Sequence, residues 1–182
     1  MADYPNQVTF RFVEVELLDD LRQLGFVEGD VMAAKTEHDR HQVMDICEDG
    51  NIDMVRRVMN RAFAECVELC YPYSKIPMSE SDLTDIDDVL YNGSPNYGPL
   101  KPVTQYVMEL NLPNEFSETT VKLIEAYIHE YLICSVMCYW MSIVKPEAEA
   151  HWKEKVEAAG QSIRSSLNSR CGRVRRPLTP FG

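Results

Sequence analysis

Apolar residues recur every three or four positions over residues 51–70, and this spacing predicts an amphipathic α-helix. Asn51 is placed to cap the start of this helix, and Pro72 follows its end. Charged residues occupy most of the opposite face, so we expect the helix to cover one side of a core. Its apolar positions are Ile52, Val55, Met59, Ala62, Phe63, Cys66, Leu69 and Cys70.

A longer helix is predicted over residues 117–144, with Ser117 as its cap. Its second half, residues 131–144, is apolar on every side and carries no charge over 14 residues. A helix that spans a membrane needs about 20 such residues, so we predict a buried helix and no membrane contact. Several elements, or another subunit, must then cover it.

A third helix is predicted from Pro146 to about residue 167, since proline is favoured in the first turn of a helix. Its apolar stripe is narrow and therefore suits a single packing partner. The stripe consists of Trp152, Val156, Ala159, Ile163 and Leu167.

Two segments, residues 8–16 and residues 103–112, alternate apolar and polar side chains as β-strands do. A slip in the alternation at Phe12 and Val13 indicates a β-bulge in the first of them. If the two segments pair, they form a small sheet beside the helices. Residues 31–47 have no clear pattern apart from one or two helical turns at their end.

These elements predict a mainly α fold, a helical bundle with long helices, a small two-stranded sheet and an extended C-terminal arm. Residues 1–167 form the mainly helical domain in this interpretation, and residues 168–182 form the arm. Residues 73–102 are rich in turn-forming residues, so we expect a loop-rich insertion there, with a short helix over residues 81–91.

The sign of the charge reverses near the C-terminus. Residues 1–157 hold 13 Lys or Arg against 29 Asp or Glu, whereas residues 158–182 hold five arginines and no acidic residue. An acidic body repels phosphate, which argues against general coating of DNA but suits a bore through which DNA slides. A basic arm on an acidic body is expected to bind an acidic surface outside its own core, such as a second copy of the protein.

Four of the six cysteines form two Cys-x3-Cys pairs, Cys66 with Cys70 and Cys134 with Cys138. Residues four apart on a helix share a face, so two such pairs could present four thiolates to zinc. Both pairs lie on apolar stripes, however, which favours buried free thiols. The first five residues lack the features of a secretory signal, and we therefore expect the thiols to be reduced.

Other clusters of metal-binding residue types have simpler explanations. Glu37 and His41 lie four apart, but no third ligand is specified, and a solvated helix face explains them. The acidic residues of 45–53 and 82–88 do not have the spacing of a calcium loop and are typical of helix caps and first turns. No phosphate-binding loop or nucleophile elbow occurs. We therefore predict no enzyme, no catalytic or metal-binding residues and no cofactor.

The arm itself allows three interpretations. It is a docking arm, a disordered solubilising end, or a nucleic-acid-binding tail, although a tail of the last kind usually interleaves aromatic residues. The first interpretation is favoured because arginines and apolar anchors alternate along an extended, proline-containing segment. The predicted partner-binding residues are Arg170, Arg173, Val174, Arg175, Arg176, Leu178 and Phe181.

A family resemblance rests on two segments of the chain. Residues 48–73, which begin Glu-Asp-Gly-Asn-Ile-Asp-Met-Val-Arg-Arg, resemble a segment of a connector protein of crAss-like gut phages. Residues 163–181, with Arg-Val-Arg-Arg-Pro-Leu-Thr-Pro-Phe at their end, resemble another. The order of parts, a mainly helical domain followed by a basic arm, is similar to head-to-tail adaptors of short-tailed phages.

The resemblance implies a structural protein of the virion neck, made in the cytoplasm of the host bacterium. It implies a homo-oligomeric ring, typically a dodecamer, that contacts the portal protein and further tail or ring proteins. DNA would pass through this ring without sequence-specific binding, and the arm would anchor each subunit on the portal or a neighbour. The two predicted strands depart from a purely helical adaptor. The alternative from composition alone is a nucleic-acid-binding regulator that uses its basic tail.

Overall fold

Helices make up most of the chain in this computed structural model, which describes residues 6–31, 37–74, 105–113 and 116–169. The predicted mainly α fold with a small antiparallel sheet is confirmed. In chain order the elements are β1 (Asn6–Val13), α1 (Glu14–Val31), α2 (Glu37–Met44), the short 3-10 helix η1 (Asp45–Cys47), α3 (Ile52–Leu69), β2 (Gln105–Leu112), α5 (Glu118–Val144) and α6 (Pro146–Asn168).

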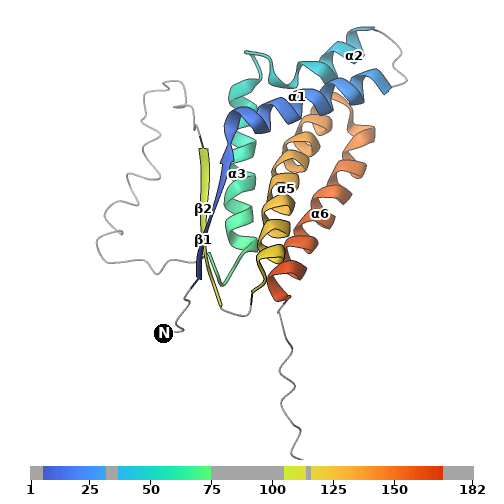
Figure 1. Cartoon of the computed structure of the whole chain (residues 1–182). Helices are drawn as coiled ribbons and strands as arrows, with labels where there is room; N and C mark the ends of the chain where they lie inside the picture. Colours follow the sequence, from blue (N-terminus) through green and yellow to red (C-terminus); the bar gives the residue numbers. More distant parts are fainter. Residues whose placement is uncertain (1–5, 32–36, 75–104, 114–115, 170–182) are drawn as a thin grey trace, which may run out of the picture.

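Helix α5 is the centre of the bundle. It packs against α3 on one side and α6 on the other, and α1 and α2 cross its upper end in Figure 1. The prediction that several elements cover its apolar second half is therefore confirmed. One polar contact fixes this junction, because the indole Nε1 of Trp140 donates to the backbone oxygen of Val43, 3.1 Å away.

The three helices expected from apolar spacing occur close to their predicted bounds. Ser117 caps α5 by accepting a hydrogen bond from the backbone N–H of Thr119, and Pro146 opens α6. Asn51 precedes α3, but its side chain does not cap that helix. It donates instead to the backbone oxygen of Asp45, 2.9 Å away, and so ties α3 to η1.

The two strands pair in an antiparallel sheet, from Asn6 opposite Leu112 to Val13 opposite Gln105. The sheet lies beside α3 in Figure 1. There the hydroxyl of Tyr106 donates to Oδ1 of Asn60 in α3, 2.9 Å away. Alternate residues of both strands face the core, namely Phe10, Phe12, Tyr106, Met108, Leu110 and Leu112.

Two predictions at the first strand are wrong. The strand ends at Val13 because Glu14 begins α1, which the sequence pattern did not reveal. The register continues through Phe12 opposite Tyr106 and Val13 opposite Gln105, so there is no bulge among these paired residues. In the segment without a clear pattern, α2 and η1 include the helical turns expected at its end.

Two glycines allow α1 to lie against α2 and η1. A Cβ atom at Gly29 would lie 2.8 Å from Cγ of Met44, and one at Gly25 would lie 3.0 Å from Cγ2 of Ile46. A larger residue at either position would make these neighbours shift, so glycine favours the close approach of the two segments.

A buried ion pair joins the start of α1 to α3. Nε of Arg56 lies 2.7 Å from Oε1 of Glu14, and Glu14 is almost completely buried. The hydrogen bond to Glu14 raises the pKa of Arg56, which keeps the guanidinium charged. The pair therefore fixes the sharp change from strand to helix at residue 14.

Replacing Glu14 with glutamine is expected to lower the free energy of unfolding by about 2–3 kcal/mol, because Arg56 loses its charged partner in a partly buried site. Asp53, 3.6 Å from Arg56, compensates in part. Glu16→Gln, at an exposed position of the same helix, is the control and should change stability by less than about 0.5 kcal/mol. Equal effects in urea denaturation would show that the pair does not stabilise the fold.

Candidate functional site

All seven predicted partner-binding residues, Arg170, Arg173, Val174, Arg175, Arg176, Leu178 and Phe181, lie outside the described residues. Their role stays a prediction. The structure describes the body that carries the arm, the point from which the arm departs and the surfaces that a partner would meet.

The arm begins at the end of the bundle opposite α1. Helix α6 starts directly after α5, runs back along it and ends at Asn168, at the lower end of the molecule in Figure 1. The last turn is held by the core, since Ile163 and Leu167 are buried. The side-chain amide of Asn168 donates to the backbone oxygen of Arg164, 2.9 Å away. A chain cut after Asn168 would therefore keep the core contacts that α6 makes with the described residues.

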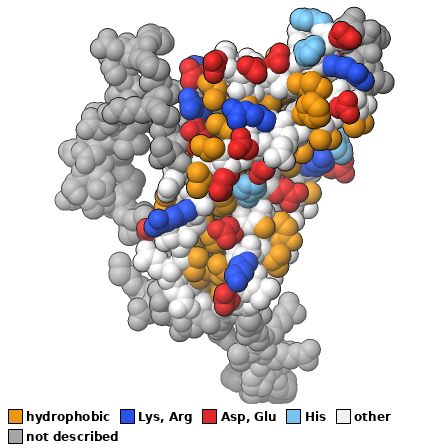
Figure 2. Space-filling model, turned by 45° about the horizontal axis from the view of Figure 1, so that its top comes forward, with side chains coloured by type: hydrophobic (Ala, Val, Ile, Leu, Met, Phe, Trp, Pro, Cys, Tyr) orange, Lys and Arg blue, Asp and Glu red, His pale blue; other side chains and the backbone are white. Residues whose placement is uncertain are grey.

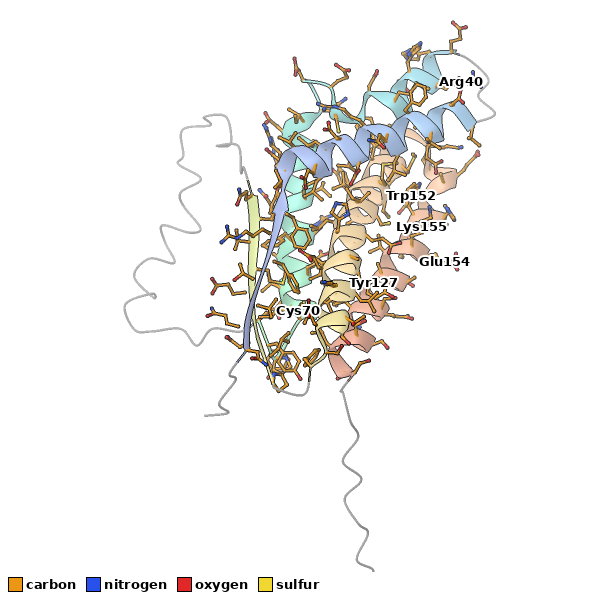
Figure 3. The ribbon with its side chains drawn as sticks, viewed as in Figure 1. Arg40, Cys70, Tyr127, Trp152, Glu154 and Lys155 are labelled. Carbon is orange, nitrogen blue, oxygen red and sulfur yellow. The ribbon has the colours of Figure 1, made fainter. Side chains whose placement is uncertain are left out.

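A groove of about 510 Å³ lies between α1, α5 and α6. Its apolar lining comes from Leu24, Val27, Ile133, Cys134 and Trp152. Polar side chains complete it, namely Asp20, Gln23, His129, Glu130 and Lys155. Figure 3 labels Trp152 and Lys155 on the upper half of α6, toward α1. A largely apolar groove with a few polar groups is typical of a binding site.

Trp152 is the most unusual residue in this groove. The side chain is almost completely buried, and its Nε1 has no hydrogen-bond acceptor among the described residues. Nζ of Lys155 lies 4.0 Å from the centre of the indole ring, which is a cation–π contact. Trp140 differs because its own Nε1 donates to Val43. A buried donor that lacks an acceptor destabilises the protein.

A contact between a histidine and a carboxylate borders the groove. Nε2 of His129 in α5 lies 3.2 Å from Oδ2 of Asp20 in α1, and both side chains are partly exposed. Glu130, the next residue in α5, is exposed and forms no ion pair with any residue of the described ranges. This carboxylate is thus available to a positively charged ligand.

Exposed apolar residues of α1 extend the groove. Val27 is 54% exposed, and Phe26 and Val31 beside it are more exposed still. Figure 2, which brings the α1 end of the molecule forward, shows patches of hydrophobic side chains among the charged ones on this face. Large contiguous patches of this kind often lie at binding surfaces. The sequence pattern did not point to them, because it did not reveal α1.

The cysteine pairs do not meet in one site. No group of three or more His, Cys, Asp or Glu residues is arranged to hold a metal ion within the part of the chain that the structure describes. Cys66, Cys70 and Cys134 are buried in the core, as the apolar stripes predicted, and Cys138 is half-buried. Burial raises the pKa of all four thiols, which disfavours the thiolate form that zinc binds.

The other clusters considered as metal ligands also lack a site. Glu37 and His41 are exposed on α2, and His38 of the same helix pairs with Gln42 through Nε2 and the side-chain amide, 3.2 Å apart. Asp53 pairs with Arg56, and Asp49 is exposed. Residues 82–88 lie outside the described ranges.

None of the helices that the structure describes is long and apolar enough to cross a membrane.

Comparison with known proteins gives no family. No protein-family model matches the chain, and no curated protein or solved structure matches it either. The function must therefore be argued from the residues and surfaces described above.

Proposed function

We propose that this protein is a structural component of a tailed-phage virion, a connector that forms a ring between portal and tail around the DNA channel. The observation that carries the proposal is the reversal of charge, with an acidic body that ends in an arm of four arginines and no acidic residue. Subunits with complementary charges at opposite ends associate head to tail, and such contacts close into a ring when the rotation allows it.

The acidic body supports a position around DNA. Lysines and arginines that neutralise phosphates hold DNA, whereas a bore rich in Asp and Glu forms few such contacts and lets it slide. The family resemblance implies a ring that is typically of twelve subunits. The protein acts by assembly in this proposal, without catalysis or a cofactor.

The arm is proposed as the anchor of each subunit on the portal or on a neighbour. Its arginines suit bidentate pairing with carboxylates, and Val174, Leu178 and Phe181 supply apolar anchors between them. The resemblance implies the same position for the arm. The point of departure supports this, since α6 ends at the surface of the bundle with its own apolar stripe already buried.

Removing the arm after Asn168 is expected to abolish assembly while the free energy of unfolding changes by less than about 1 kcal/mol, because α6 keeps its core contacts. The measurement is the mass in solution by light scattering, alone and with the portal protein of the same phage. A full chain that forms ring-sized or portal-bound species, and a truncated chain that stays monomeric, would support the proposal.

A matched control distinguishes the contribution of the arginines from that of the apolar anchors. Changing Val174, Leu178 and Phe181 to serine keeps all four arginines of the arm, so assembly lost in this variant must depend on the apolar anchors. If the truncated protein still joins portal and tail, the role of the arm is refuted. A monomer whose arm binds DNA, with affinity that falls steeply as salt rises, would support the nucleic-acid-binding regulator instead.

A further inference from the structure

We propose that the groove between α1, α5 and α6 receives the C-terminal arm of a second copy of this protein, with the Pro177–Pro180 segment beside Trp152. The inference rests on the proposed function and makes it specific, since it names the acceptor surface. It joins two features that lie far apart in the sequence, a half-apolar groove with a buried indole N–H and an arm with apolar anchors.

The groove includes a residue with an unpaired hydrogen-bond donor, and the arm carries carbonyl oxygens that can accept. Nε1 of Trp152 is a buried donor that lacks an acceptor among the described residues. The arm brings acceptors, because prolines 177 and 180 have no N–H group and retain their carbonyl oxygens. Two prolines three residues apart favour the polyproline II conformation, whose carbonyl groups form no internal hydrogen bonds. Aromatic-lined grooves bind segments of this type.

The apolar and charged side chains of the arm are also complementary to those that line the groove. Leu178 and Phe181 of the arm flank Pro180, and the groove offers Val27 and Ile133 as apolar contacts. Arg175 and Arg176 come directly before Pro177. The groove carries the carboxylates of Asp20 and Glu130, the second of which is exposed and has no ion pair within the described ranges. Its one lysine, Lys155, stacks on the Trp152 ring.

The length of the chain favours a second copy over the same copy. Trp152 lies 17 residues before Ser169 on α6, which corresponds to about 25 Å along the helix axis. The eight residue-to-residue steps from Ser169 to Pro177 span at most about 29 Å when fully extended, and the chain would first have to reverse direction at the end of α6. The arm leaves the bundle at the end opposite α1, so docking on another copy is head to tail.

The test uses two variants of the full chain, one in the groove and one in the arm. Val27→Asp places a carboxylate at the apolar groove without disturbing the core, since Val27 is half exposed. Phe181→Asp removes the last apolar anchor of the arm. Each variant alone is expected to weaken self-association by at least about tenfold, as at a residue central to an interface. Val15→Asp, at an exposed position of α1 outside the groove, should assemble like the unaltered protein.

Mixing the two variants gives the decisive result. The intact arm of Val27→Asp can enter the intact groove of Phe181→Asp, after which both remaining sites are defective, so assembly should stop at two copies. In that complex the NMR signal of the Trp152 indole N–H should shift, while that of Trp140, already bonded to Val43, should not. Light scattering measures the mass, and circular dichroism checks that each variant is folded.

Each other outcome overturns the inference. If Val27→Asp assembles normally while Phe181→Asp does not, the arm docks elsewhere and the connector proposal still stands. If neither variant affects assembly, or if the full chain is monomeric, the arm has no acceptor on a second copy. If the mixture forms no pair, the groove does not take the arm from another subunit. Equal changes in the stability of a monomer would point to the protein's own arm as the occupant.

Discussion

Replacing Leu132 with alanine is expected to lower the free energy of unfolding by about 3–5 kcal/mol. Leu132 is fully buried in the middle of α5, the helix that packs against α3, α6, α1 and α2. Truncation there loses the transfer free energy of the side chain and leaves a cavity that surrounding helices cannot fill without moving. Urea denaturation followed by circular dichroism measures the change.

The matched control lies on the same helix. Leu123 is 46% exposed, so Leu123→Ala should lower the free energy of unfolding by less than about 1 kcal/mol. Both changes remove the same atoms from the same type of backbone, and only burial differs. Similar effects for the two variants would contradict the central position of α5 in the bundle.

The sequence was sufficient for α3, α5 and α6 because their signals are local. Apolar residues repeat with the period of a helix, and prolines or a capping serine mark where these helices begin or end. The cap of α3 is instructive, since Asn51 occupies the cap position while its side chain bonds to Asp45. The residue at which α3 begins was predictable from the sequence. The acceptor that the Asn51 side chain uses was not, because it lies in the neighbouring turn at Asp45.

Helix α1 was missed for physical reasons. Val15 continues the alternation that begins at Val13 past the true end of the strand, although Val15 lies on the exposed side of the helix. Further along, α1 has a buried stripe with Leu17 and Leu21 and an exposed group with Val27. Apolar residues on two faces blur the helical period. Its glycines, usually taken as breakers, serve close packing against α2 and η1.

The groove could not have been predicted from the sequence at all. It is formed by residues of α1, α5 and α6 that are up to about 135 positions apart, and no linear motif joins them. The unpartnered indole N–H of Trp152 is likewise a property of packing, since the spacing of α6 identified Trp152 only as a core residue. What the sequence did contain was the other half of the proposed contact, the arm.

Raising the pH from 9 to 10 is expected to destabilise the protein by about 4 kcal/mol, because four cysteines are buried as neutral thiols. Removal from solvent is the main cause in each. Burial raises the pKa of Cys47 and Cys134 from an ordinary value near 9.0 to about 11 and that of Cys70 to about 12. The pKa of Cys66 is raised further, and this residue is fully buried.

The direction of the effect follows from the protons bound in each state. Below pH 9 the thiols are neutral in both states, and their contribution to stability is fully present. As pH rises from 9 to 10, they ionise in the unfolded chain but not in the folded one, so each thiol lowers the free energy of unfolding by about 1 kcal/mol over this step. Folded proteins typically have 5–15 kcal/mol of stability, so the protein should unfold between about pH 10 and 11.

Urea denaturation at a series of pH values measures this slope directly. Cys47→Ala provides the control, because removing one of the four thiols should reduce the slope above pH 9 by about a quarter. The same variant at pH 7 should lose only the packing of one sulfur atom and its hydrogen bond to Leu18. A free energy of unfolding that stays constant from pH 8 to 10.5 would mean that these thiols reach solvent in the folded protein. That result would reopen the question of whether the helical cysteines act as ligands rather than as part of the core.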